Sequence, residues 1–531
     1  MNISSSTAIR IPDLQTGNEI IARLPLTDPL AAAREIGRIL DGFLVAPPEH
    51  ETHFRLLERV RQPAAFVAEE LGKRYEDKPV PFGDAEEEAF REAAALWIKT
   101  GKAYASCAER ASPESPQPGR FATLLHRCIH FTGRAILEHF RAHRQLPWGL
   151  WLDMHGYYGT AEDMGLATLP VPGVPEASAG GTHCAAAYLA FILCDMAGCY
   201  SLDSRDQAII SRWAAAWSDL AGVHPAGAGK TLPPLVIDLV QDVALRPVAE
   251  CLHTDQIRYL DTSRLAAHIE HVRQQLRQRA LPSQLALGDD CTARQCAHLL
   301  GHLASRWTQA HATRRFKRRA TSGVIQVCTG FEEIHYFISG KEFRQPCETD
   351  VYSRRDFEDT FAMRFQENPR YAPPIRQPIT ATYSADTWEV VNQSADGFRL
   401  MRGLGGRKLA YGQLLALRPH DGDRFLLAQT TWLMQESRGG LIAGIRALPG
   451  LPAAICARPA AVAEERHEPY QRAFLMSTPN PAHAEQSLVL PAGWYRLGRV
   501  IEVFTDRAWR AYLKTVLDTG PDFERISFEV G

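Results

Sequence analysis

A change of hydrophobic period near residue 319 constrains this chain more than any other feature of its sequence. Before that point, apolar residues recur at the spacing of amphipathic helices in seven segments: 31–44, 53–71, 85–108, 120–143, 182–199, 206–221 and 265–276. After it, short β-rich segments alternate with turn residues at 322–328, 334–339, 379–383, 388–391, 414–417, 426–432 and 441–447. The pattern predicts a mostly helical N-terminal half followed by an antiparallel barrel or sandwich.

We therefore predict an α+β multidomain protein, since 531 residues suffice for about three domains. Residues 1–312 are expected to be helical, with a sub-boundary near the proline-rich segment 112–119. Residues 313–458 are expected to form the barrel, interrupted by an insertion at about 345–378.

The C-terminal residues 459–531 form a small β-rich region in this prediction. Its expected elements are strands at 488–490, 494–504 and 527–530 and a short helix at 507–517. The insertion in the barrel is expected to be partly helical around 355–365.

Composition excludes several classes of protein. Lys and Arg number 59 against 61 Asp and Glu, which argues against a chain that binds DNA or RNA over its whole surface. No stretch approaches the ~18 uninterrupted apolar residues of a membrane helix, and residues 1–10 lack the apolar core of a signal peptide. Eleven cysteines without CxxC pairs argue against a disulfide framework. We expect a cytoplasmic protein with no membrane insertion.

Two motif-like clusters fail a test of spacing. Residues 227–231 read GAGKT, but a phosphate-binding loop needs GxxxxGK[ST] and His224 holds the place of its first glycine. The second cluster and two similar histidine pairs match no zinc signature and are expected to be ordinary core or surface residues: Cys291, Cys296, His298 and His302, then His126/His130 and His139/His143.

The segment 148–164 contains a cluster of acidic residues and a histidine, which is the strongest, though weak, indication of an enzymatic site in the sequence. Its members are Asp153, His155, Glu162 and Asp163. No residue supplies a nucleophile or oxyanion hole at a recognisable spacing, so we expect a packed, hydrogen-bonded core and no catalytic residues.

A dense basic run precedes the first predicted strand. Residues 314–319 read RRFKRR and hold five cations in six positions. Charge runs are usually solvated. Because fifty of the 59 cations are Arg, chance alone predicts about five RxxxR matches in a chain of this composition. The run therefore says little without a second element.

That second element is a turn at residues 392–397, which read NQSADG and fit [DN]xSxxG. Chance predicts about 0.1 such matches in this composition, and the chain holds this one. It follows the predicted strand 388–391, so it lies at a strand end.

In this order the two elements resemble the PilZ domain family, a six-stranded antiparallel barrel. The resemblance covers residues 314–452, and the positions that match the family pattern are Arg314, Arg315, Arg319, Asn392, Ser394, Gly397 and Leu400. Seventy-two residues separate Arg319 from Asn392, more than is usual for the family, and we assign the excess to the insertion.

The resemblance implies that the chain binds cyclic di-GMP, with no cofactor and no metal. The implied ligand-binding residues are Arg314, Arg315, Arg319, Asn392, Ser394 and Gly397, with Arg318 ranked lower. An Arg fork suits phosphate oxygens and guanine N7/O6, and Asn and Ser offer short polar groups to a guanine edge. Glycine permits an unusual backbone conformation or a close approach to the ligand.

We expect a non-enzymatic receptor that transmits the second messenger to a protein partner through its helical half. The alternative is a ligand-free adaptor in which the barrel is structural and the basic run docks an acidic protein. Motility and biofilm regulation are the processes that the family resemblance suggests.

Overall fold

The chain divides into two compact units in this computed structural model. The helical unit comprises Met1–Arg315 and Trp432–Ile442, and the barrel unit comprises Phe316–Thr431 and Ala443–Gly531. The structure describes residues 8–111, 117–172, 182–226, 233–251, 255–308, 319–320, 322–346, 383–394, 397–419, 422–460, 468–477 and 486–531.

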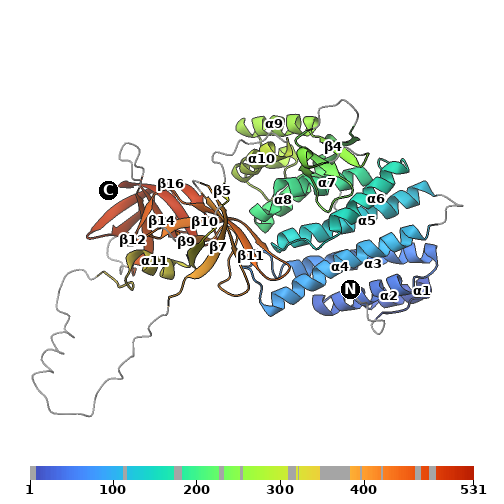
Figure 1. The fold of residues 1–531 in the computed structure, drawn as a ribbon, viewed down its shortest axis with the longest axis horizontal. Coiled ribbons are helices and arrows are strands. Elements are labelled where there is room, and N and C mark those ends of the chain that lie inside the picture. The colour runs from blue at the N-terminus through green and yellow to red at the C-terminus, as the bar shows by residue number, and fades with distance from the viewer. Residues whose placement is uncertain are drawn as a thin grey trace, which may run out of the picture. The chain divides into compact units, whose positions relative to one another are not determined.

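Ten α-helices among the described residues build most of the helical unit, and Figure 1 shows α2 to α6 lying side by side. They are α1 (Leu14–Ala22), α2 (Pro29–Val45), α3 (His50–Gly72), α4 (Asp84–Glu109), α5 (Pro118–Arg141), α6 (Leu150–Asp163), α7 (Cys184–Ala197), α8 (Ser204–Trp217), α9 (Ser263–Arg277) and α10 (Ala293–Trp307). Single 3₁₀ turns follow at Cys199–Ser201, Ser218–Leu220, Val248–Glu250 and Pro282–Leu285. The predicted helical half is confirmed.

Side-chain caps fix where several helices begin. The Asp28 carboxylate accepts hydrogen bonds from the backbone N–H groups of Leu30 and Ala31, and Pro29 starts α2. Asp203 caps α8 in the same way by accepting from the N–H of Asp206 at 2.8 Å. These contacts satisfy donors that the first turn of a helix leaves without partners.

A buried carboxylate organises the core between α3, α4 and α5. Glu138 is 1 % exposed and accepts hydrogen bonds from the Tyr75 hydroxyl at 2.6 Å and the Trp97 indole N–H at 2.8 Å. Arg141 lies 3.4 Å from the same carboxylate. A buried charge is tolerated because its oxygens are hydrogen-bonded.

The helical unit also holds elements that the periodicity did not predict. These are α1, α6, α10 and a small antiparallel sheet of order β1-β4-β2-β3. Its strands are β1 (Gly222–Pro225), β2 (Leu235–Asp238), β3 (Arg246–Pro247) and β4 (Ile257–Asp261). Within the described ranges, no helix combines the length and apolar character that crossing a membrane requires.

The barrel unit begins with a ring of six strands, which confirms the predicted barrel. Its elements are β5 (Arg319–Ala320), β6 (Val324–Thr329), α11 (Phe331–Ser339), β7 (Asp386–Gln393), β8 (Gly397–Arg402), β9 (Leu414–Pro419), β10 (Leu426–Gln435) and β11 (Leu441–Ala447). The order is β5-β7-β6-β9-β10-β11-β8, and pairing of β8 with β7 closes the ring. β5 adds to the edge of β7.

A second closed barrel follows in the same unit, where the sequence predicted a small β-rich region. Its strands are β12 (Leu451–Pro459), β13 (Gln471–Ser477), β14 (Ser487–Pro491), β15 (Val500–Phe504), β16 (Ala508–Thr519) and β17 (Phe523–Val530), in the order β12-β13-β14-β17-β16-β15. β12 starts a few residues before the expected boundary at 459. Helix α11 packs against β12 and β13, and His335 Nε2 donates to the Ile455 carbonyl at 3.1 Å.

The secondary structure predicted for two segments is wrong. Residues 334–339 were expected to be a strand and lie in α11, where Glu332 and Glu333 in the first turn favour a helix. Residues 507–517 were expected to be a helix and lie in β16, which pairs with β15 and β17. The expected insertion around 355–365 and the strand 379–383 fall mostly outside the described residues.

Candidate functional site

The end of the basic run lies beside the strand that leads into the predicted turn. β5 pairs antiparallel with the end of β7, which sets Arg319 opposite Gln393 and Ala320 opposite Asn392. The pairing of β5 with β7 therefore brings the end of the basic run next to the start of the NQSADG turn, although the two are far apart in the sequence. Three other predicted residues, Arg314, Arg315 and Arg318, lie outside the described residues.

Asn392 presents a polar atom that lacks a partner in the part of the chain that the structure describes. Its Oδ1 is buried and accepts no hydrogen bond from any described residue. A buried acceptor without a donor costs about 1–3 kcal/mol. Such a group calls for an explanation, and a ligand that brings an N–H or O–H donor supplies one.

A β-bulge in β7 determines the face of the strand on which the Asn392 side chain lies. The register of β7 against β8 shifts between Val390 and Asn392, so that Val390 opposes Leu400 while Asn392 opposes Arg399. Leu400 is 1 % exposed and points into the barrel core. Because side chains alternate along a strand, Arg399 points to the outer face, and Asn392 shares that face with it. Bulges commonly re-aim side chains beside functional sites.

The turn after β7 is closed by Ser394 and Gly397. The backbone N–H of Ser394 donates to the Gly397 carbonyl at 2.8 Å, and the Ser394 hydroxyl donates to the same oxygen at 3.3 Å. The serine predicted to contact the ligand thus also shapes the turn.

Gly397 has a packing role. A Cβ at this position would lie 2.6 Å from the backbone carbonyl oxygen of Ile445 in β11. Glycine is therefore required because two strands approach closely. The family resemblance implies a special backbone conformation or room for the ligand at this position, and the close approach to Ile445 gives a different reason for the glycine.

The other ends of β7 and β8 hold a cavity of about 300 Å³ that includes none of the predicted residues. The Arg402 guanidinium donates to Asp386 and lies 4.9 Å from the ring centroid of Trp388. Burial lowers the pKa of Arg402. Both terminal guanidinium nitrogens of Arg402 have partners, in Asp386 and in the Arg407 carbonyl, so we interpret this ion pair as structural and assign the cavity no ligand.

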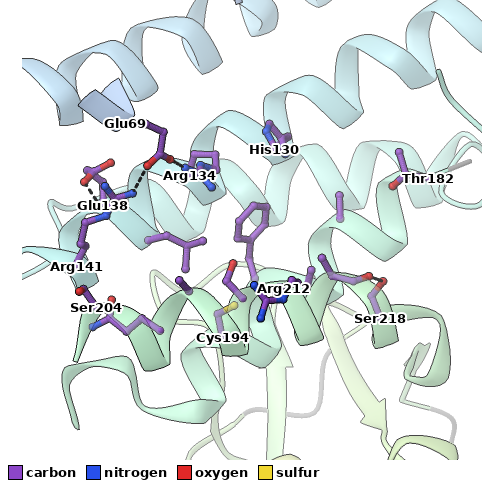
Figure 2. Close-up of a pocket in the computed structure, with 18 of the residues that line it drawn as sticks. Glu69, His130, Arg134, Glu138, Arg141, Thr182, Cys194, Ser204, Arg212 and Ser218 are labelled. Atoms are coloured by element: carbon purple, nitrogen blue, oxygen red, sulfur yellow. Dashed lines mark hydrogen bonds and ion pairs between the residues drawn. The ribbon is translucent and has the colours of Figure 1, made fainter. Parts of the chain in front are cut away.

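The helical unit has a larger groove, of about 510 Å³, lined by α3, α5, α7 and α8 (Figure 2). At one end Glu69 accepts from Arg134 and Arg141, and Arg141 lies beside Glu138. The walls between are mostly small or apolar: Ala186, Ala187, Ala190, Phe191, Ala208 and Ala215. No motif in the sequence indicated this groove, because its residues come from four separate helices.

The histidine pair His126/His130 lines that groove. His126 is buried, and its Nε2 lies 3.3 Å from the Thr182 hydroxyl. Burial, followed by the neighbouring charge of His130, lowers the pKa of His126 well below its usual range. A neutral, hydrogen-bonded histidine fits the core role that the sequence analysis expected.

The acid–base and zinc-like clusters are also structural. His155 is fully buried and contacts the Tyr188 hydroxyl at 2.7 Å and the Val243 carbonyl at 2.9 Å. Glu162 pairs with Arg258 at 2.6 Å. His302 Nε2 donates to the Ala197 carbonyl at 2.8 Å. Among the described residues, no three His, Cys, Asp or Glu side chains converge as a metal site. The GAGKT segment lies outside the described residues.

Three family models match the chain in sequence order. They describe the N-terminal domain of the cyclic-di-GMP receptor FimW at residues 15–226, its middle PilZ domain at 241–372, and its C-terminal β-barrel domain at 455–530. The central part of the chain matches a PilZ domain, which confirms the predicted resemblance to the PilZ domain family. The PilZ match includes the basic run and stops before Asn392, so the NQSADG turn rests on the geometry described above.

A curated relative of this chain is the cyclic-di-GMP receptor FimW of Pseudomonas aeruginosa. The two are 24 % identical over 514 residues, which cover 89 % of this chain and 80 % of the relative. No solved structure matches the chain.

Proposed function

We propose that this chain binds cyclic di-GMP where β5 meets the end of β7, in a regulatory and not a catalytic role. One observation carries the proposal: β5 sets Arg319 opposite Gln393 and Ala320 opposite Asn392, whose buried Oδ1 has no partner among the described residues. The names of the family and of the relative support the choice of ligand.

The chemistry of the ligand suits these residues. Cyclic di-GMP carries two phosphates and two guanines. Arginine forks from the basic run pair with phosphate oxygens or with guanine N7 and O6. Guanine N–H groups supply the donors that Asn392 Oδ1 lacks. Arg318 is the lower-ranked member of this set, and whether one nucleotide or a stacked pair binds is an outcome of the titration.

We further propose that the helical unit passes the signal to a protein partner. Helix α10 ends at Trp307, seven positions before Arg314, so the basic run follows the helical unit closely along the chain. The groove along α5 is a concave surface of the kind that helical proteins use for binding (Figure 2). The cytoplasm is the compartment that this proposal requires.

Isothermal titration of the full chain with cyclic di-GMP tests the proposal. The wild type is expected to release heat with one saturable transition. The double variant Arg315→Ala/Arg319→Ala is expected to lose several kcal/mol of binding free energy, because charge-assisted hydrogen bonds contribute about 1.5–3 kcal/mol each. Arg507→Ala/Arg510→Ala, which removes two exposed cations from the second barrel, is the control for net charge.

A flat titration at micromolar protein would overturn the receptor function and favour the ligand-free adaptor. In that case a pull-down through the helical unit would retain its partner whether or not cyclic di-GMP is added. A receptor instead gives a pull-down that changes with the nucleotide.

A further inference from the structure

Two cysteine sulfurs touch in the helical unit. The Sγ atoms of Cys291 and Cys296 lie 2.7 Å apart, and the residues are 9 % and 0 % exposed. Among the ten cysteines that the structure describes, this is the one pair in thiol–thiol contact. A disulfide bond is about 2.05 Å long, so bond formation needs only a small movement of either sulfur.

The loop that carries Cys291 is held in place by α8. The Leu287 carbonyl accepts from the Trp213 indole N–H at 2.9 Å and from Arg212 at 3.3 Å. Arg212 also donates to both carboxylate oxygens of Asp290, at 2.7 and 3.1 Å. On the other side, the Thr292 hydroxyl caps α10, which carries Cys296. Both sulfurs are therefore positioned by structure that surrounds them.

We propose that Cys291 and Cys296 form a reversible disulfide when a hydroperoxide oxidises the protein. In the first step the peroxide O–O bond breaks, an S–O bond forms at Cys291 and one water leaves. In the second, Cys296 Sγ attacks the Cys291 sulfur, the S–O bond breaks and a second water leaves. Two thiols and one hydrogen peroxide thus give one disulfide and two waters.

The two cysteines differ in environment, which sets the order of the steps. Burial, followed by the hydrogen bond with Cys291, raises the pKa of the Cys296 thiol, so Cys296 reacts second and its proton leaves in the second water. Cys291 is the more exposed of the two residues, and we propose that it meets the oxidant first. The new bond closes a short ring across the start of α10, and a dithiol reductant reopens it by exchange.

Tryptic mapping of the full-length protein tests this directly. Arg294 lies between the two cysteines, so trypsin places them on the separate peptides 280–294 and 295–306. After hydrogen peroxide treatment and alkylation, we expect these peptides to appear joined without reductant and separate after dithiothreitol. Cys291→Ser and Cys296→Ser should each abolish the joined species.

Cys194 and Cys199 provide a matched internal control. They are also five residues apart and buried, but the Cys199 thiol donates to the Cys194 carbonyl at 3.1 Å. Their peptide should be alkylated at both positions after the same treatment. The joined peptides should also become much rarer when the protein is oxidised in urea, because unfolding separates the sulfurs. Equal alkylation of Cys291 and Cys296 in folded, oxidised protein, or equal joining in urea, would overturn the proposal.

Discussion

The Nδ1 atom of His143 lies 3.0 Å from the backbone carbonyl oxygen of Leu433, a residue 290 positions further along the chain. The carbonyl of His143 accepts from the Gln435 N–H at 2.7 Å, and the Gln145 N–H donates to the Gln435 carbonyl at 2.9 Å. The segment after α5 therefore pairs with the end of β10 as a short parallel bridge. These bonds explain why Trp432–Ile442 belongs to the helical unit.

Replacing His143 should loosen this attachment. His143→Ala removes a buried donor to the Leu433 carbonyl, so the free energy of unfolding should fall by about 0.5–1.5 kcal/mol. Amide exchange should speed up most at Gln435. Unchanged exchange across 432–442 in His143→Ala would contradict this role.

A second variant separates the hydrogen bond from backbone strain. His143 has a φ of +49°, in the left-handed region that disfavours a Cβ. His143→Gly loses the same donor but relieves the strain. It should therefore be more stable than His143→Ala by about 1 kcal/mol, with the same fast exchange at Gln435.

His53 should make the helical unit sensitive to acid. It is fully buried, and neither ring nitrogen has a partner among the described residues. Burial, followed by the charges of Arg110 and His50, lowers the pKa of His53 to about 4. The unfolded chain binds this proton near pH 6.5, so stability is full above that pH and falls as pH drops from 6.5 towards 4. The lowered pKa of His53 contributes about 3 kcal/mol to the free energy of unfolding at neutral pH.

Urea titrations between about pH 7.5 and 5 measure this effect. His53→Phe keeps an aromatic ring beside Phe43, whose ring centroid lies 5.1 Å from that of His53. The variant should lose less stability than the wild type on acidification. If the free energy of unfolding of His53→Phe fell with decreasing pH as steeply as that of the wild type, other histidines with lowered pKa values, such as His126 and His155, would be responsible for the acid sensitivity.

Periodicity predicted the helical half and the first barrel because those elements bury one face and expose the other. It failed at 334–339, where Phe331, Ile334 and Ile338 face the core at helical spacing but sit in a run rich in β-branched and aromatic residues. It failed again in β16, where Ala511 and Leu513 are buried at alternate positions. The sequence of a short apolar segment is compatible with both a helix and a strand, and the tertiary packing decides between them.

The candidate site was predictable in its parts and not in its geometry. The sequence indicated the basic run and the NQSADG turn, and neither reveals that Arg319 pairs with Gln393. The bulge at Val391 and the close approach of Gly397 to Ile445 arise from pairing with distant strands. The groove and the Cys291–Cys296 contact likewise need tertiary structure, because spacing along the chain does not report distance in space.

Asn392→Ala should weaken binding of cyclic di-GMP without weakening the fold. Its Oδ1 has no described partner, so truncation removes a buried polar atom and should leave the thermal midpoint unchanged or raised. Binding loses one hydrogen bond, which predicts about a tenfold higher Kd by isothermal titration. Gln393→Ala, at the exposed neighbouring position, is the control and should change neither quantity much. Loss of stability with unchanged affinity would assign Asn392 to the fold instead.

Gly397→Ala should destabilise the first barrel. The new Cβ would lie 2.6 Å from the Ile445 carbonyl oxygen, and backbone on both sides leaves no flexible side chain to move. Such overpacking costs about 1–3 kcal/mol. Gly403→Ala is the matched control, because Gly403 lies in the loop after β8 and a Cβ added there would meet no described atom within 4 Å. Denaturant unfolding of both variants tests this prediction. Equal denaturant midpoints for Gly397→Ala and Gly403→Ala would mean that β8 and β11 can move apart to accommodate the added Cβ.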